Sequence, residues 1–193
     1  MFDPTIFDNL KVVLEGLVYD HDLAGRIMIT DRSDWIDLAK LSRSFRIRFR
    51  IRTPDDPVQA TAEWADAGQK EHDRHFIQAE IVLSAGVKDL AGEIMGLNMG
   101  DADRPGCELK IRWITVIQDV EECEPIRRLL MEVWEADHPI TQRISYDVHD
   151  PARLALTSEL DFQRKIDENQ IEDLPGLMEH VLRSLFLLQE RLA

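Results

Sequence analysis

A chain of 193 residues is long enough for one large domain with its own core, or at most for two small ones. Hydrophobic residues make up 44% of it and charged residues 31%, as in ordinary globular proteins. The formal net charge of -14 argues against nucleic acid and anionic membrane surfaces as partners, because proteins bind both by neutralising negative charge. No apolar run approaches the roughly 20 residues that a membrane-spanning helix needs.

The cysteines and the N-terminus indicate a compartment. The segment Met1-Phe2-Asp3-Pro4 lacks the basic start and apolar core of a signal peptide. Cys107 and Cys123 are the only cysteines and have no metal-type spacing, which fits reduced thiols. We therefore expect a cytoplasmic protein with no metal and no cofactor.

Two strands are expected near the start of the chain. The valines and leucines of residues 11–20 predict a strand, with Gly16 as a bulge or bend. Residues 21–25 then read as a hairpin turn into a second strand over residues 26–30.

A helix is expected next. Asp31 begins it, and Trp35, Leu38 and Ala39 recur along it at helical spacing. Residues 57–67 stay open between helix, strand and loop.

Residues 44–52 predict the clearest strand. Alternate residues fall on opposite faces of a strand, so one face is apolar and the other carries four guanidinium groups. The apolar residues are Phe45, Ile47, Phe49 and Ile51, and the arginines are Arg46, Arg48, Arg50 and Arg52. We call these four arginines the arginine ladder.

The second half of the chain alternates strands and helices. Strands are expected over 75–83, 107–118, 139–148 and 154–165, and helices over 87–97, from 121 and over 173–192. Short turns between strands imply antiparallel pairing. The sequence therefore predicts a single α+β domain over residues 1–193, with a mostly antiparallel sheet of about seven strands in two layers and helices mainly on one face. A β-α-β-β-α order occurs over 26–98 and again over 107–192, which suggests a weak internal duplication. The expected core is Leu109, Ile111, Trp113, Ile126, Leu130, Val133, Leu160, Phe162, Leu182 and Leu185.

The arginine ladder has a structural and a functional interpretation. Glu80, Glu159 and Asp161 lie on polar strand faces, where they would pair with Arg48 or Arg50 across the sheet. Exposed pairs of this kind contribute at most about 1 kcal/mol, so changing one of these arginines to glutamine should alter stability little. The alternative is recognition of an anionic ligand by the guanidinium forks. Alternation alone explains the residue choice, so the structural interpretation is favoured.

The last helix has an apolar surface wider than one sheet usually buries, which includes Val181, Leu185 and Leu188 as well as Leu182 and Phe186. Another helix of the same chain or a second subunit would cover the excess. A homodimer through residues 175–192, or binding of another protein, is therefore expected.

The function is not fixed by any motif. The chain contains no G-x-G-x-x-G after a strand, no G-x-x-x-x-G-K-[ST] and no G-x-S-x-G, and no motif assigns it to a family. We expect a non-catalytic cytosolic protein-binding, adaptor or chaperone-like domain. The alternative is a small-molecule enzyme or ligand-binding protein in which the arginine ladder holds an anion and His72, Asp73 or His75 supplies acid-base or metal chemistry.

Overall fold

Six strands form one antiparallel sheet in the order β1-β2-β3-β4-β6-β5 in this computed structural model. The structure describes residues 5–54, 56, 77–95, 104–135 and 140–192. The strands are β1 (Ile27–Asp37), β2 (Ser42–Ile51), β3 (Ile77–Ala85), β4 (Cys107–Ile117), β5 (Ile140–Asp147) and β6 (Asp150–Ile166). The helices are α1 (Thr5–Leu23), α2 (Val87–Met95), α3 (Cys123–Val133) and α4 (Leu174–Leu192), with 3-10 turns η4 (Val120–Glu122) and η5 (Glu168–Asp173).

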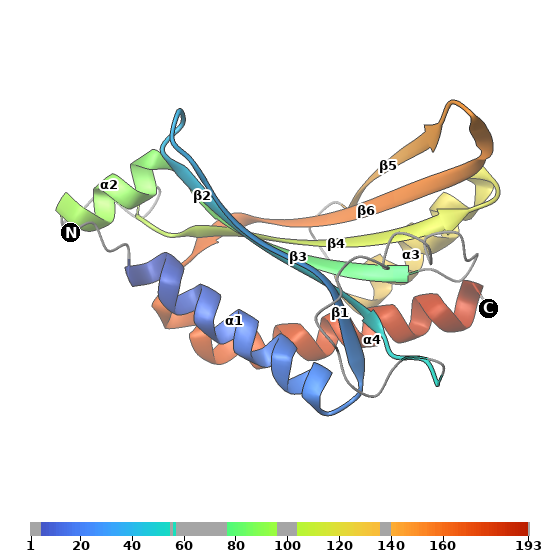
Figure 1. The fold of residues 1–193 in the computed structure, drawn as a ribbon, viewed down its shortest axis with the longest axis horizontal. Coiled ribbons are helices and arrows are strands. Elements are labelled where there is room, and N and C mark those ends of the chain that lie inside the picture. Colours follow the sequence, from blue (N-terminus) through green and yellow to red (C-terminus); the bar gives the residue numbers. More distant parts are fainter. Residues whose placement is uncertain (1–4, 55, 57–76, 96–103, 136–139, 193) are drawn as a thin grey trace.

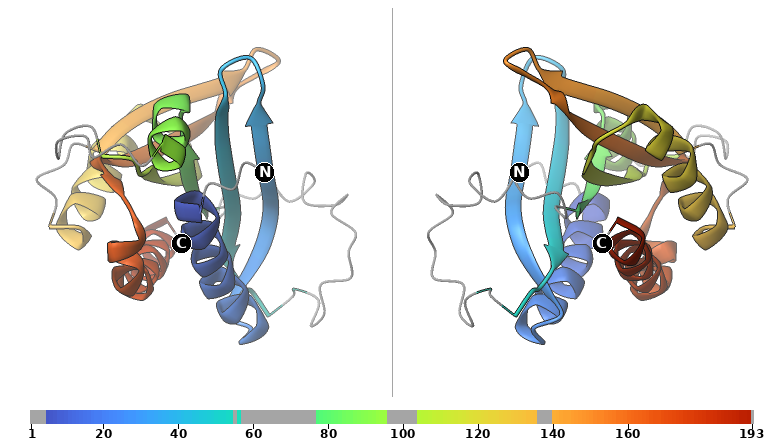
Figure 2. Two further views of the ribbon diagram at one scale, coloured as in Figure 1. Left: turned by 90° about the vertical axis from the view of Figure 1, so that its left-hand side faces the viewer. Right: turned by 90° about the vertical axis from the view of Figure 1, so that its right-hand side faces the viewer.

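The long helices α1 and α4 run along the same face of the sheet (Figure 1). The sheet wraps around them, and α3 lies on the same side next to α4 (Figure 2). The predicted two-layer α+β arrangement, with antiparallel pairing and helices mainly on one face, is confirmed. The opposite face, which we call the open face, carries no helix within the described part of the chain.

Residues 11–20 are helical, so the predicted first strand is wrong. They form the middle of α1, which begins at Thr5 and ends at Leu23. Phe7, Leu10, Leu14 and Val18 follow one another at three- and four-residue steps, and all four are buried against the sheet. Gly16 lies on the exposed side of this helix rather than at a strand bulge.

The helix predicted from Asp31 is also wrong, because β1 continues to Asp37. It pairs with β2 from Ile27 opposite Ile51 to Asp37 opposite Ser42. The carboxylate of Asp37 accepts hydrogen bonds from the backbone N–H groups of Ala39 and Lys40, and this closes the hairpin.

Both corrections bear on the strand count and the repeat. Within the described residues the sheet has six strands rather than about seven, because residues 11–20 are helical. Among the described elements of the first half, the expected helix between the first two strands of the β-α-β-β-α order is absent, because β1 runs to Asp37 and is followed directly by β2. Residues 57–67, which the sequence left open, lie outside the described residues.

The core fills the space between the sheet and the helices. Alternate residues of β2, β3 and β4 point into it, as Phe45, Ile47 and Phe49 show. Every predicted core residue is buried except Phe162, which is partly buried against the cluster. The apolar side of the arginine strand therefore faces the helices, and its arginines lie on the open face.

Candidate functional site

The open face of the sheet carries the arginine ladder and its neighbours. Arg46, Arg48 and Arg50 lie on β2, and Arg52 follows directly after it. Pairing to β1 and β3 fixes which side chains stand beside each arginine. Arg48 is flanked by Asp31 and Glu80, whereas Arg46 is flanked by Ser33 and Val82. The four positions therefore differ in their electrostatic surroundings.

A chain of ion pairs crosses the middle of the open face. Arg48 Nη2 lies 2.8 Å from Glu80 Oε1, and Arg112 Nη1 lies 3.0 Å from Glu80 Oε2. Arg112 Nε then donates to Glu159 Oε2 at 2.6 Å. Glu80 is only 2% exposed, although it stands on the face without helices. Two guanidinium groups therefore neutralise a nearly buried carboxylate.

The pKa of Arg112 reflects these contacts. Burial acts to lower it, but the hydrogen bonds to Glu159 and Glu80 outweigh burial and raise the pKa above its ordinary value. Lys110 lies two residues before Arg112 on β4, on the same face. Its Nζ lies 2.8 Å from Asp161 Oδ2. The predicted pairing of Arg48 with Glu80 is confirmed, whereas Glu159 and Asp161 pair with cations of β4 instead.

Arg50 is bound to Asp56 in the segment after β2. Its Nη1 donates to Asp56 Oδ2 at 2.7 Å, and Thr53 donates to the same oxygen through its backbone N–H and its hydroxyl. Burial acts to raise the pKa of Asp56, but the hydrogen bonds from Arg50 and Thr53 outweigh it and hold the pKa well below its usual range. The carboxylate of Asp56 therefore stays charged inside the protein.

Arg52 reaches the end of α1. Its Nη2 lies 3.2 Å from Asp22 Oδ1, and its Nε donates to the carbonyl oxygen of Ile27. Asp22 is available there because residues 11–20 form a helix that ends beside β1. Arg48, Arg50 and Arg52 thus each have a carboxylate partner in the same chain.

Arg46 is held differently. Its guanidinium carbon Cζ lies 3.9 Å from the centroid of the Trp35 ring, a cation–π stack between β2 and β1. Its neighbours in register, Ser33 and Val82, carry no charge. Within the part of the chain that the structure describes, no carboxylate lies within ion-pair distance of Arg46.

A hollow of about 390 Å³ lies beside Arg46 on the open face. It crosses the strands from β1 to β4. Its lining combines an exposed aromatic ring, serine hydroxyls, three cations and two carboxylates: Trp35, Asp37, Ser42, Ser44, Arg46, Val82, Ser84, Glu108, Lys110 and Arg112. Lys110 and Arg112 have carboxylate partners, so Arg46 is the cation of this hollow that can accept an external anion.

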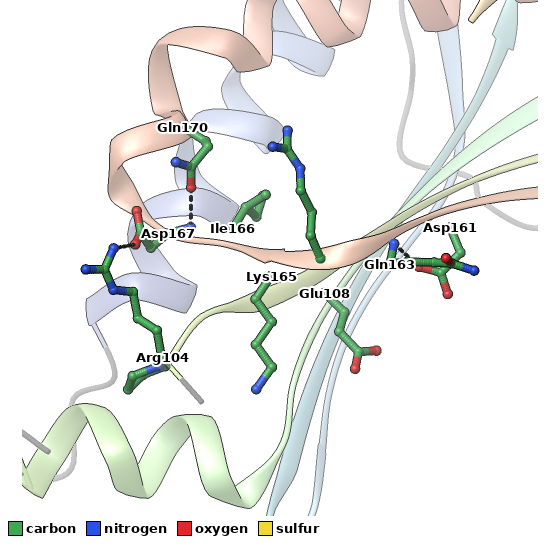
Figure 3. Close-up of a pocket in the computed structure, with 10 residues that line it drawn as sticks. Arg104, Glu108, Asp161, Gln163, Lys165, Ile166, Asp167 and Gln170 are labelled. Carbon is green, nitrogen blue, oxygen red and sulfur yellow. Dashed lines mark hydrogen bonds and ion pairs between the residues drawn. The ribbon is translucent and has the colours of Figure 1, made fainter. Parts of the chain in front are cut away.

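A larger hollow of about 650 Å³ lies at the far end of β6, where Arg104, Lys165 and Asp167 surround it (Figure 3). Its described lining holds as many carboxylates as cations. Arg104 pairs with Asp167 at 3.9 Å, and Lys165 pairs with Asp89. With three carboxylates against three cations, it is a poorer anion site than the hollow at Arg46, where two carboxylates stand against three cations.

The tip of the β1–β2 hairpin carries exposed apolar side chains. Trp35 is 55% exposed and Leu38 is 80% exposed, and Ile36 and Leu41 are exposed between and beside them. We call these four residues the hairpin patch. As neighbours on β1, Trp35 and Ile36 point to opposite faces, so the patch surrounds the tip and Trp35 is its part on the open face. The hairpin extends beyond the helical layer (Figure 1), so α1 and α4 do not cover it.

The wide apolar surface of α4 is mostly covered by its own chain. Val181, Leu185 and Leu188 are buried, and α1 and α3 pack beside the helix. Phe186 is the large apolar residue of α4 that remains more than a third exposed, at 44%. The sequence left two explanations for this surface, another helix of the same chain or a second subunit. Helices of the same chain cover most of it.

The remaining sequence candidates are histidines, an aspartate and the two cysteines. His72, Asp73 and His75 lie outside the described residues. Elsewhere in the described ranges, His, Cys, Asp and Glu side chains form no group of three or more that would hold a metal ion. Cys107 and Cys123 are free thiols, and burial raises the pKa of Cys107 to about 12.

Comparisons with protein-family models, curated proteins and solved structures found no match. Among the described helices, none has the length and apolar character needed to cross a membrane. The function therefore has to be argued from the open face and the hairpin.

Proposed function

We propose that this chain is a non-catalytic cytosolic protein-binding protein of the adaptor or chaperone-like kind. The hairpin patch carries the proposal. Four large apolar side chains within seven residues, Trp35, Ile36, Leu38 and Leu41, are exposed at one tip of the sheet. Clustered exposed apolar surface is typical of contact with another protein.

The ion pairs of the open face support binding rather than catalysis. Arg48 and Arg50 already have carboxylate partners that are nearly buried, Glu80 and Asp56. Catalytic groups usually carry pKa values near the pH at which they work. The lowered pKa of Asp56 instead keeps its carboxylate charged, as a structural ion pair requires.

A second candidate function is binding of an anionic small molecule, in line with the ligand-binding interpretation of the arginine ladder. The observation that favours it is Arg46, which lines the 390 Å³ hollow and has no described carboxylate within ion-pair distance. The other three arginines would have to leave their carboxylates before they held a ligand. In this second candidate function, Arg46 alone would bind the anion, whereas the sequence suggested a site made of all four arginines.

Self-association belongs to the same proposal. A second copy of the chain is one partner that the hairpin patch would accept, since homodimers are common among soluble proteins. The originally expected interface through residues 175–192 would now depend on Phe186, because Val181, Leu185 and Leu188 already pack inside the chain. Sedimentation of the Phe186→Ser variant separates the two interfaces: a dimer held by α4 dissociates, and a dimer held by the hairpin persists.

Photo-crosslinking from the hairpin tests the proposal. A photoreactive amino acid is placed at Leu38 and, as a matched control, at Val12, which is also exposed but lies on α1. We expect discrete crosslinked products from position 38, either with another protein or at twice the chain mass, and none from position 12. Replacing Ile36 and Leu41 by serine should remove these products while the protein stays folded, because both side chains are exposed. Equal crosslinking from positions 38 and 12 would overturn the proposal.

A further inference from the structure

We infer that Arg46, stacked on Trp35, is a receptor for an aspartate or glutamate carboxylate in an extended acidic–apolar segment of a partner protein. The inference rests on the proposed protein-binding function and names the chemistry of the partner. The ligand carboxylate would lie in the 390 Å³ hollow, and the apolar side chains next to it would lie on the hairpin patch.

Strand register leaves Arg46 free for an external anion. Arg48 has Asp31 and Glu80 beside it, and both flanking positions of Arg46 are neutral. A guanidinium group is never deprotonated at physiological pH, so its charge needs an anion or water. The sequence thus supplies internal anions to three members of the arginine ladder and none, within the described residues, to the fourth.

The stack on Trp35 prepares Arg46 for binding. The guanidinium carbon lies over the indole ring, 3.9 Å from its centroid, so the aromatic ring holds the group from one side. The N–H groups of a guanidinium lie in its own plane and can bind a carboxylate with two parallel hydrogen bonds. Holding the side chain in place before binding also lowers the entropic cost of ordering it.

The surroundings of the hollow favour a peptide over a free anion. Ser42, Ser44 and Ser84 line it and offer hydroxyl groups to the polar backbone of an extended segment. Trp35 is half exposed and belongs both to the lining of the hollow and to the hairpin patch. A small anion gains only the ion pair, whereas a segment with apolar residues beside its carboxylate also buries apolar surface.

The overall charge of -14 works against any anion at long range. At physiological ionic strength, exposed charges farther apart than about 8 Å are largely screened. Binding should therefore be measured at that ionic strength, where distant carboxylates have little effect. Asp37 and Glu108 line the hollow itself, so the contacts at Arg46 and the apolar contacts have to outweigh the repulsion from these two carboxylates.

The experiment is a titration of the isotope-labelled chain, followed by NMR, with two capped peptides. The probes are acetyl-Leu-Glu-Leu-Glu-Leu-amide and its glutamine counterpart, acetyl-Leu-Gln-Leu-Gln-Leu-amide. We expect the glutamate peptide to shift the signals of the Arg46 side chain and the Trp35 indole, and the glutamine peptide to bind at least tenfold more weakly. Sodium acetate at equal concentration forms the third arm. If acetate shifts the same signals as strongly as the glutamate peptide, the site takes small anions and the inference is overturned.

Variants connect the binding to Arg46. Arg46→Gln should weaken the glutamate peptide at least tenfold, whereas Arg191→Gln, the same charge change at the exposed end of α4, should leave binding unchanged. Arg46→Lys keeps the charge without the planar fork and should fall between Arg46→Gln and the unchanged protein. The unchanged protein provides a test that needs no variant. If the glutamate peptide shifts only NMR signals of residues away from Arg46 and Trp35, the inference is overturned.

The same Arg46→Gln variant separates this inference from the proposed function. If crosslinks from position 38 form but peptide binding does not depend on Arg46, the carboxylate receptor is wrong and the protein-binding function stands. If the peptide binds through Arg46 but position 38 yields no products, the site stands and the proposed function is wrong.

Discussion

Arg50 donates hydrogen bonds to both carboxylate oxygens of Asp56, and the side chain of Asp56 is fully buried. The pair ties the end of β2 to the segment that follows it. Breaking a buried ion pair leaves an uncompensated charge, which costs more than losing an exposed pair. We expect Asp56→Asn to lower the free energy of unfolding by about 2–4 kcal/mol, as measured by urea denaturation.

Arg50→Gln should destabilise the protein comparably, because it leaves the Asp56 carboxylate buried without its cation. The sequence alone predicted a change of at most about 1 kcal/mol for this variant, on the assumption that both partners are exposed. Arg46→Gln is the matched control, since Arg46 has no described carboxylate partner, and should stay within about 1 kcal/mol. Equal effects of the two variants would contradict the assignment of the Arg50–Asp56 pair.

Stability should fall on acidification because of Asp56. Its pKa is lower in the folded protein than in the unfolded chain, so below about pH 4 the unfolded chain binds more protons. The stabilisation is fully present above the unfolded pKa and is lost as the pH falls towards the folded pKa. Urea midpoints measured between pH 6 and pH 2 should therefore decline less steeply for Asp56→Asn than for the unchanged protein. Parallel declines would show that other carboxylates govern acid unfolding.

The two glutamates of the open-face ion pairs should differ in importance. Glu80 is nearly buried and binds both Arg48 and Arg112, whereas Glu159 is half-buried on β6. We expect Glu80→Gln to cost about 2–4 kcal/mol and Glu159→Gln about 1 kcal/mol or less in chemical denaturation. A larger loss for Glu159→Gln would mean that the contact of Arg112 with Glu159, rather than with Glu80, holds the strands together.

The sequence specified the strands well where the alternation of side chains was unambiguous. The apolar and charged faces of residues 44–52 lie as predicted, because each face has one environment and a one-residue slip would exchange them. The pairing of Arg48 with Glu80 followed from the same alternation. The partner of Arg50 did not, because Asp56 lies beyond the strand, in a segment to which no periodicity applies.

Two local ambiguities produced the wrong elements. In residues 11–20, valines and Gly16 favoured a strand, but tertiary packing of Leu10, Leu14 and Val18 selected the helix. After Asp31, the helical spacing of Trp35, Leu38 and Ala39 favoured a helix, but pairing with β2 keeps this segment extended as far as Asp37. The extended conformation of Trp35, and so its stack on Arg46, was missed for this reason.

The two thiols should react at very different rates. Burial raises the pKa of Cys107 to about 12, and Cys123 is only half-buried, with a pKa also raised by burial. Because the thiolate is the reacting form, Ellman's reagent at pH 8 should modify the folded protein at Cys123 and leave Cys107 until the protein unfolds. Cys123→Ser should then show no reaction in the folded state and one thiol in denaturant. Rapid modification of Cys107 in the folded variant would show that this end of β4 opens to solvent.

Two glycines should respond to alanine in opposite directions. Gly16 lies on the exposed side of α1, and a Cβ atom added there meets nothing within 4 Å. Gly16→Ala should stabilise the protein by about 0.5–1 kcal/mol, because alanine loses less backbone entropy in a helix than glycine does.

A Cβ atom at Gly106, just before β4, would stand 2.8 Å from the carbonyl oxygen of Ile166 at the end of β6. That backbone oxygen cannot move aside without disturbing the pairing of Cys107 with Ile166, so Gly106→Ala should destabilise the protein by about 1–3 kcal/mol. Thermal and urea unfolding of the two variants measure both effects. A destabilised Gly16→Ala protein would contradict the helical assignment of residues 11–20, on which the position of Asp22 beside Arg52 depends.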